Sequence, residues 1–105
     1  MAARLELARA EVVSLALDID EADRLLASAR AQFESLDDPI GVGDCLLLEG
    51  QNCRIWGRGE PIEVCKAARR QLLGQGDEAR EGIALAEIVT SMPGLISART
   101  VCMEE

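Results

Sequence analysis

Five segments rich in apolar residues follow one another along this chain, separated by short clusters of Gly, Pro and Asp. In the first segment, ARLELARAEVVSLAL, apolar and charged residues mix over 15 positions without a Gly or Pro, which favours a helix over a strand. The other segments have similar lengths and tolerate only occasional glycines. The predicted helices cover about residues 3–17, 21–36, 40–56, 61–73 and 78–91.

Aspartates stand at the expected starts of three of these helices. Asp18 or Asp20 offers N-cap chemistry to the second helix, and Asp77 offers it to the fifth. Asp38 precedes Pro39, a residue suited to the first helical turn. The links between helices are only a few residues long, so neighbouring helices are expected to pack antiparallel as repeated helix–turn–helix units.

Composition agrees with an all-α protein. Apolar residues make up 49% of the 105, but the chain has one Phe, one Trp and no Tyr. Ala and Leu favour helices, whereas sheets favour aromatic and β-branched residues. The length allows a single domain, residues 1–105.

Two stretches of the chain repeat each other. The sequence LDDPIGVGDCLLLEG begins at Leu36 and QGDEAREGIALAEIV begins at Gln75, so that Asp38 aligns with Asp77, at an offset of 39 in residue number. At the same offset the pairs Gly43/Gly82, Leu46/Leu85, Leu7/Leu46 and Ala29/Ala68 align. A pair of antiparallel helices with its turns has about this length in helical solenoids. The expected units are residues 1–37, residues 38–76 and the first helix of a third unit at 77–92, followed by a tail or short helix at 93–105.

The stretch DIDEADRLLASARAQF resembles the second helix of a tetratricopeptide repeat. An acidic turn leads into Glu21 and Ala22, with a bulky Leu26 and a small Ala29 at the positions where that family needs those sizes. GDEAREGIALAEIV is similar to the first helix of the longer, roughly 40-residue variants found in bacterial signalling proteins. The chain departs from the pattern at Pro61, which stands at a small-residue position, and most aromatic positions are aliphatic.

This resemblance implies a short right-handed solenoid of about two and a half repeats, with a concave groove that holds an extended peptide or a partner's helix. The first helices of successive repeats would line the groove. Carried onto this sequence, the groove residues are Arg4, Leu7, Glu11, Ser14, Gly43, Leu46, Gly50, Arg54, Gly82, Leu85 and Val89.

Several of these residues allow two interpretations. Gly43 and Gly82 would leave the backbone open to a ligand, or would simply let helices pack closely. Arg4 and Arg54 could meet a partner's carboxylate through a two-pronged contact. Trp56 either covers the end of a helical hairpin or anchors a partner.

The net charge of −8 argues against nucleic acid and anionic membrane surfaces as partners, because both need clustered Lys and Arg. No apolar run reaches the roughly 20 residues that span a bilayer. The N-terminal MAARLELARAE lacks the apolar core of a signal peptide. A cytoplasmic protein is expected.

The sequence contains few of the residue patterns that catalysis, cofactor binding or metal binding require. The chain has no His, which removes the commonest general base and an activator for its serines. The acidic DIDEAD lacks the glycine and distant Glu of a calcium loop, and GRGEP is not followed by the GK[ST] of a phosphate loop. The four Cys residues form no CxxC pair and are expected as small buried residues, although Cys53 and Cys65 could approach each other. No enzyme, cofactor or metal site is predicted.

The expected function is a protein-interaction module, the regulatory or scaffolding part of a bacterial signalling or transcription-control protein. Its partner would be a protein, a peptide or another domain of a longer chain. Two alternatives remain: a helical bundle that dimerises or links domains, and a sensor for a small ligand. The apolar LISARTVCM after Gly94 lacks the charge of a solenoid cap, so a homodimer through Leu95 and Ile96 is a further option.

Overall fold

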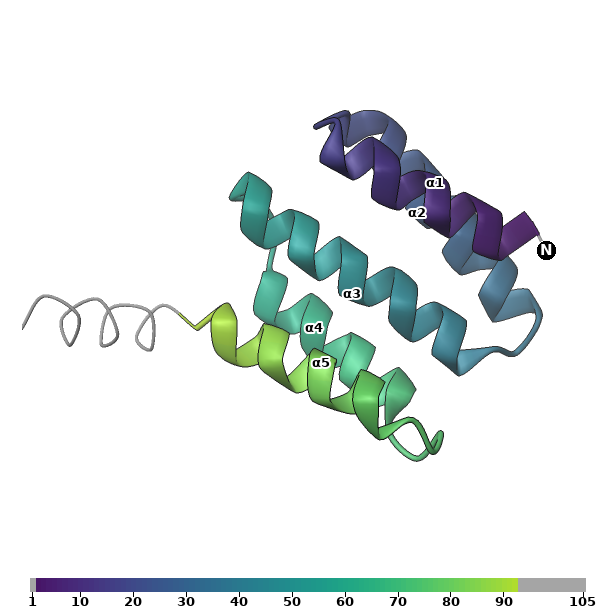
Figure 1. Ribbon diagram of the computed structural model, residues 1–105, viewed down its shortest axis with the longest axis vertical. Helices are drawn as coiled ribbons and strands as arrows, with labels where there is room; N and C mark the ends of the chain where they lie inside the picture. The colour runs from purple at the N-terminus through teal and green to yellow at the C-terminus, as the bar shows by residue number, and fades with distance from the viewer. Residues whose placement is uncertain (1, 93–105) are drawn as a thin grey trace, which may run out of the picture.

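The computed structural model describes residues 2–92, and all its regular structure is helical (Figure 1). Its five helices are α1 (Ala2–Leu15), α2 (Ile19–Ser35), α3 (Pro39–Trp56), α4 (Pro61–Leu72) and α5 (Glu78–Thr90). No strand occurs within this range. The prediction of an all-α chain with five helices is confirmed, whereas the tail predicted at 93–105 lies outside the described residues.

Aspartate caps start three helices in the same way. A side-chain oxygen of Asp18, Asp38 and Asp77 accepts a hydrogen bond from the backbone N–H three residues later, at 3.3, 3.1 and 3.0 Å respectively. Each cap satisfies one of the backbone donors that a helix start leaves without a partner. Asp18, and not Asp20, is the cap of α2.

Two residues after the end of each of the first two helices stands a left-handed residue that local sequence signals did not predict. Leu17 and Asp37 have φ values of 62° and 54°, a region in which non-glycine residues cost about 1–2 kcal/mol. The amides of Asp18 and Asp38 then bond back to the carbonyls of Val13 and Phe33, five residues earlier. This closure ends α1 at Leu15, two residues before its predicted end.

The odd-numbered helices lie side by side and run in the same direction (Figure 1). Early in each helix, Arg4 of α1 and Arg80 of α5 both pair with Asp44 of α3. Near the end of α1, Ser14 bonds to Asn52 of α3. Consecutive helices also pack against each other, and α1 contacts α3 as α3 contacts α5. The described helices therefore form two hairpins and a fifth helix.

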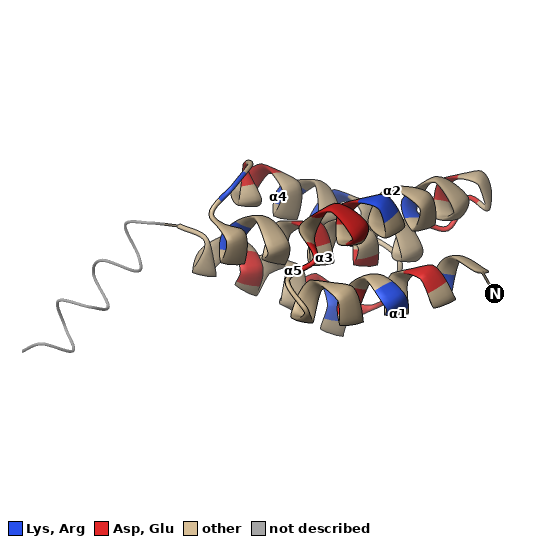
Figure 2. Cartoon of the chain, turned by 90° about the horizontal axis from the view of Figure 1, so that it is seen from above, with Lys and Arg blue, Asp and Glu red and all other residues tan. Residues whose placement is uncertain are grey.

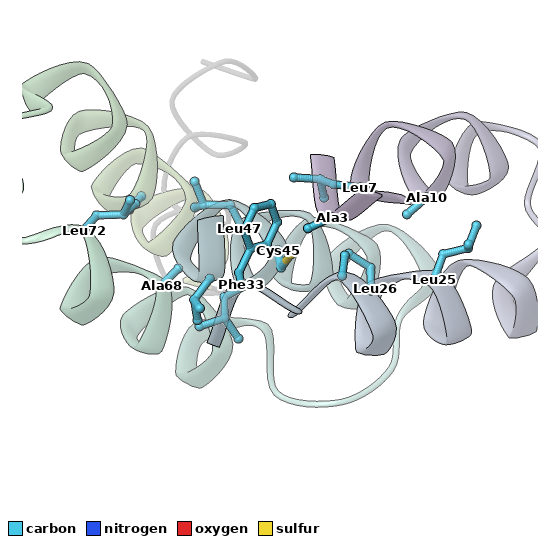
Figure 3. Packing of buried hydrophobic residues seen from close by; sticks show 14 residues of the cluster. Ala3, Leu7, Ala10, Leu25, Leu26, Phe33, Cys45, Leu47, Ala68 and Leu72 are labelled. Carbon is cyan, nitrogen blue, oxygen red and sulfur yellow. The ribbon is translucent and has the colours of Figure 1, made fainter. Parts of the chain in front are cut away.

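The core lies between the helices of each hairpin and continues from one hairpin to the next (Figure 3). Phe33 of α2 and Leu72 of α4 are its largest fully buried side chains. Complete burial of such a side chain contributes about 1.5–3 kcal/mol. Small residues occupy buried positions where helix backbones approach: Ala10, Ala22, Ala29 and Ala68 are fully buried.

Glycines of α3 serve this close packing. A Cβ atom added to Gly43 would lie 2.6 Å from Leu72 Cγ, and one added to Gly50 would lie 2.5 Å from Cys65 Sγ. Both distances are shorter than van der Waals contact. The packing interpretation therefore holds for Gly43, whereas the space beside Gly82 is open.

Candidate partner-binding groove

A groove of about 980 Å³ runs between α1, α3 and α5. We call this cavity the groove throughout. It is lined by Arg4, Leu7, Glu11, Ser14, Leu15, Leu17, Asp44, Leu47, Leu48, Gln51, Asn52, Ile55, Trp56, Asp77, Ala79, Arg80 and Ile83. Its walls therefore come from the three helices that run in the same direction.

A network of charges ties the three helices together at one end of the groove. The Oδ2 atom of Asp44 lies 2.8 Å from Arg4 Nη1, and its Oδ1 lies 2.8 Å from Arg80 Nε. Arg80 also pairs with Asp77, the cap of its own helix. The Arg4 guanidinium carbon lies 5.0 Å from the centre of the Phe33 ring, within cation–π range. Because Asp44 bonds both arginines, it fixes α1 and α5 to α3.

This network shifts the titration of its members. The backbone N–H of Arg80 and then its guanidinium bond to Asp77, and both lower the pKa of that carboxyl. Bonds to Asp44 and Asp77 raise the pKa of Arg80. All these charges are compensated within the chain, so the network does not need a ligand's charge.

Polar side chains in the middle of the groove are also engaged with one another. Asn52 donates from Nδ2 to Ser14 Oγ across 2.9 Å, and Ser14 donates to the Ala10 carbonyl. Gln51 donates to Glu87 Oε1 at 3.2 Å. Glu11 differs from them, because it forms no ion pair or side-chain hydrogen bond with the rest of residues 2–92.

Apolar side chains dominate the other end of the groove. Leu15 is 86% exposed, Leu17 is 67% exposed and Ile55 is 64% exposed, although all three face the groove. The partly buried Trp56 lies beside them, and the guanidinium of Arg58 sits 5.4 Å from its ring centre. These side chains form an uncovered apolar surface at the C-terminal ends of α1 and α3.

The predicted groove residues of α1 all line this cavity: they are Arg4, Leu7, Glu11 and Ser14. On α3 the lining includes Asp44, Leu47, Gln51 and Ile55, each one residue after the predicted Gly43, Leu46, Gly50 and Arg54. One residue turns a helical side chain by about 100°, which moves it to another face. Leu46 is consequently a core residue.

On α5 the predicted residues also lie outside the lining. Arg80 and Ile83 face the groove, whereas Gly82, Leu85 and Val89 do not line it. The buried residues of α5 are Ala84 and Ile88, which turns Leu85 and Val89 toward solvent. At the offset of 39 that aligns the caps of α3 and α5, Asp44 and Ile83 both line the groove and Cys45 and Ala84 are both buried. The predicted residues of α5 missed the groove because they were carried over from α3 residues that are themselves one position away from the lining.

Both arginines that were expected to receive a partner's carboxylate already hold one from this chain. Arg4 pairs with Asp44, and Arg54 Nη2 lies 3.3 Å from Glu87 Oε2. A ligand carboxylate would have to displace an internal one. The groove is therefore not arranged as a carboxylate receptor.

The cysteines within the described range are all free, and they lie apart from the groove lining. Burial, together with the nearby Asp44 carboxylate, raises the pKa of the Cys45 thiol to about 12. Burial also raises the pKa of Cys53 and of Cys65. The expected role of Cys as a small buried residue is confirmed for Cys45 and Cys65, since both side chains are inaccessible.

Two further surfaces bear on the alternatives. A smaller cavity of about 370 Å³ lies between α2, α3 and the turn after α3, lined in part by Asp23, Arg30 and Arg58. Leu85 and Val89 of α5 and Met92, which follows this helix, are 38–49% exposed. Leu95 and Ile96, through which a homodimer was considered, lie outside the described residues.

Charged residues of both signs are spread over all five helices, as Figure 2 shows for one side of the chain.

Within residues 2–92, no cluster of three His, Cys, Asp or Glu side chains could hold a metal ion. None of the five helices is both long and apolar enough to cross a bilayer.

No protein-family model, curated protein or solved structure matches the chain. The likeness to tetratricopeptide repeats therefore remains a prediction that rests on the residues quoted above.

Proposed function

We propose that the chain is a non-enzymatic protein-interaction module that holds a partner segment in the groove between α1, α3 and α5. The observation that carries this proposal is the uncovered apolar surface formed by Leu15, Leu17 and Ile55 inside a cavity of about 980 Å³. Exposed apolar side chains that converge in a concave surface are typical of binding sites.

The arrangement of the helices supports a short solenoid as the framework. The odd-numbered helices run in one direction side by side. The first hairpin contacts the second through α1–α3 and α2–α3 packing, and α5 packs against α3 and α4. In a tetratricopeptide-like stack the first helix of each repeat lines the concave face. The described helices α1, α3 and α5 would be these first helices, in two and a half repeats.

The proposed biological role, as part of a bacterial signalling or transcription-control protein, rests only on the resemblance to tetratricopeptide repeats. Modules similar to the longer variants of the repeat occur in bacterial signalling and transcription-control proteins, so we propose a regulatory or scaffolding role there. The partner would be a separate protein or a domain of a longer chain.

Dimerisation is a second candidate function, supported by a separate surface. Leu85 and Val89, about one turn apart on the outer face of α5, and Met92, which follows the helix, form an exposed apolar stripe. A second copy that covers this stripe would leave the groove free. Sedimentation equilibrium of the full chain and of Leu85→Asp distinguishes this role, because a dimer through α5 dissociates in the variant.

Affinity capture tests the groove. The full chain is immobilised as wild type, as Ile55→Asp and as Val12→Asp, and proteins from its native cell extract are compared by mass spectrometry. Val12 is 66% exposed and does not line the groove, so it controls for the charge placed on an exposed apolar position. The proposal predicts a protein that wild type and Val12→Asp retain and Ile55→Asp loses. Equal retention by all three proteins contradicts it.

A further inference from the structure

We propose that the segment held in the groove is an amphipathic α-helix with a basic residue beside its apolar stripe, and not an extended peptide. This inference rests on the proposed function, because it names the chemistry of the partner that the same groove receives. Three properties of the groove support it. Its polar side chains are bonded within the chain, its apolar side chains are exposed, and it carries a negative charge at Glu11.

The polar side chains of the groove are held by hydrogen bonds within the chain, which bears on whether an extended peptide can bind there. An extended segment brings N–H and C=O groups that must be paired once water is excluded. The side chains that could pair them are held in place by bonds within the chain: Arg4 and Arg80 to Asp44, Gln51 to Glu87, and Asn52 to Ser14. A peptide backbone would have to share these side chains with their internal partners or displace those partners. The groove walls are helices, whose backbone groups are internally bonded except at the ends. A helical occupant satisfies its own backbone and needs none of these groups.

The apolar lining suits the stripe of a helix. Leu15 and Leu17 from the end of α1 face the same cavity as Ile55 from the end of α3, and Ile83 of α5 lines it as well. The partly buried Leu48 contributes further apolar surface, whereas Leu47 is 7% exposed and belongs mainly to the core. A helix presents apolar residues at positions i, i+3, i+4 and i+7 as a continuous ridge, which is the way helices bind in grooves.

Charge favours a basic helix. The lining contains two basic residues, Arg4 and Arg80, and three acidic residues, Glu11, Asp44 and Asp77. Asp44 and Asp77 are neutralised by the arginines, so that Glu11 supplies the remaining negative charge in the groove. The net charge of −8 for the chain attracts basic partners over a longer range. A Lys or Arg next to the apolar stripe would pair with Glu11.

Four synthetic peptides test this choice by calorimetric titration of the full chain. The first is a helix of about five turns with a Leu stripe and Lys on its flanks. The second replaces every Lys with Glu, the third carries two central prolines that break the helix, and the fourth scrambles the stripe. Trp56 is the chain's single Trp and lines the groove, so a change in its fluorescence emission reports that the peptide's apolar side chains have entered the groove.

Two pairs of variants locate the binding. Ile55→Asp removes an apolar groove residue, with Val12→Asp as its control. Glu11→Lys reverses the free charge in the groove, with Glu34→Lys as its control, since Glu34 lies on α2 outside the groove and makes an exposed ion pair. Added salt should weaken binding of the basic helix.

The proposal predicts that the basic helix binds at least about tenfold more tightly than the other three peptides. Ile55→Asp and Glu11→Lys should each weaken its binding by about tenfold or more, and their controls should not. If the acidic or proline-broken peptide binds as tightly and still depends on Ile55, the basic helix is the wrong occupant although the groove function stands. If the wild type self-associates through the groove and Ile55→Asp is monomeric, a second copy is the occupant and the proposal fails. If no binding depends on Ile55, both the proposal and the groove function fail.

Discussion

Asn52 on α3 donates a hydrogen bond to the hydroxyl oxygen of Ser14 on α1, across 2.9 Å. Asn52 is only 5% exposed, and Ser14 in turn donates to the Ala10 carbonyl one turn earlier at 2.7 Å. This chain of bonds is a polar connection between the first and second hairpins in the middle of the groove. It sets the distance between two of the groove walls.

Ser14→Ala should therefore destabilise the fold by about 1–3 kcal/mol, because it leaves the buried Asn52 amide without its acceptor. The double variant Ser14→Ala/Asn52→Leu should be more stable than Ser14→Ala, since it removes both partners and keeps the volume at position 52. Urea unfolding followed by circular dichroism measures both. A double variant less stable than Ser14→Ala would show that the hydrogen bond is not what the site depends on.

Asp44→Ala should lower the free energy of unfolding by about 1–3 kcal/mol, because it leaves Arg4 without its carboxylate and Arg80 with Asp77 alone. The Asp44 side chain is 15% exposed, whereas those of Arg4 and Arg80 are 40% and 36% exposed, so water replaces part of the bonds that the arginines lose. Glu34→Ala, which breaks the exposed Arg30–Glu34 pair, is the matched control and should cost less than about 1 kcal/mol. Equal losses in the two variants would remove Asp44 from the centre of the network.

The glycines of α3 and α5 should respond to alanine with opposite signs. Gly82→Ala should stabilise the chain by about 0.5–1 kcal/mol, because nothing lies within 4 Å of the added Cβ and Ala favours helix. Gly43→Ala should destabilise it by about 1–3 kcal/mol, because Leu72 must move. Thermal unfolding of the two variants decides this. A stabilised Gly43→Ala would mean that α3 and α4 are packed less closely than described.

Cys45 and Cys65 should resist alkylation in the folded chain. The thiolate is the reactive form, and burial raises the pKa of both thiols, that of Cys45 to about 12. At about pH 8, iodoacetamide should modify these residues in urea but leave them free in native buffer. Mass spectrometry of the digested protein measures the fraction of Cys45 and of Cys65 that iodoacetamide has modified. Rapid native labelling of Cys45 would place it outside the core.

Local signals in the sequence predicted the helices well, because they act within a few residues. Asp38 and Asp77 cap α3 and α5 as their positions next to Pro39 and Glu78 suggested. The ends of α1 and α2 were less predictable, since Leu17 and Asp37 take the left-handed conformation that normally calls for glycine.

The face that each helix turns to the groove could be predicted only for α1. Leu7 lines the groove with Leu47, whereas the spacing of the caps pairs Leu7 with Leu46, one residue away. The lengths of the turns and the rotation of each helix about its axis determine which residues face the groove. A local sequence motif predicts neither of them. The Arg4–Asp44–Arg80 network was missed for the same reason, because its members lie far apart in the sequence.

Amide chemical-shift mapping of the full, isotope-labelled chain tests the central claim most directly, that the groove between α1, α3 and α5 is the surface that receives a partner. The chain is titrated with the basic amphipathic peptide, and shifts are followed for every assigned residue in 2–92. The account predicts the largest changes at Leu15, Ile55 and Ile83, with little change on α2 and on the outer stripe of α5. Largest changes at Leu85, Val89 and Met92, or on α2, would contradict it.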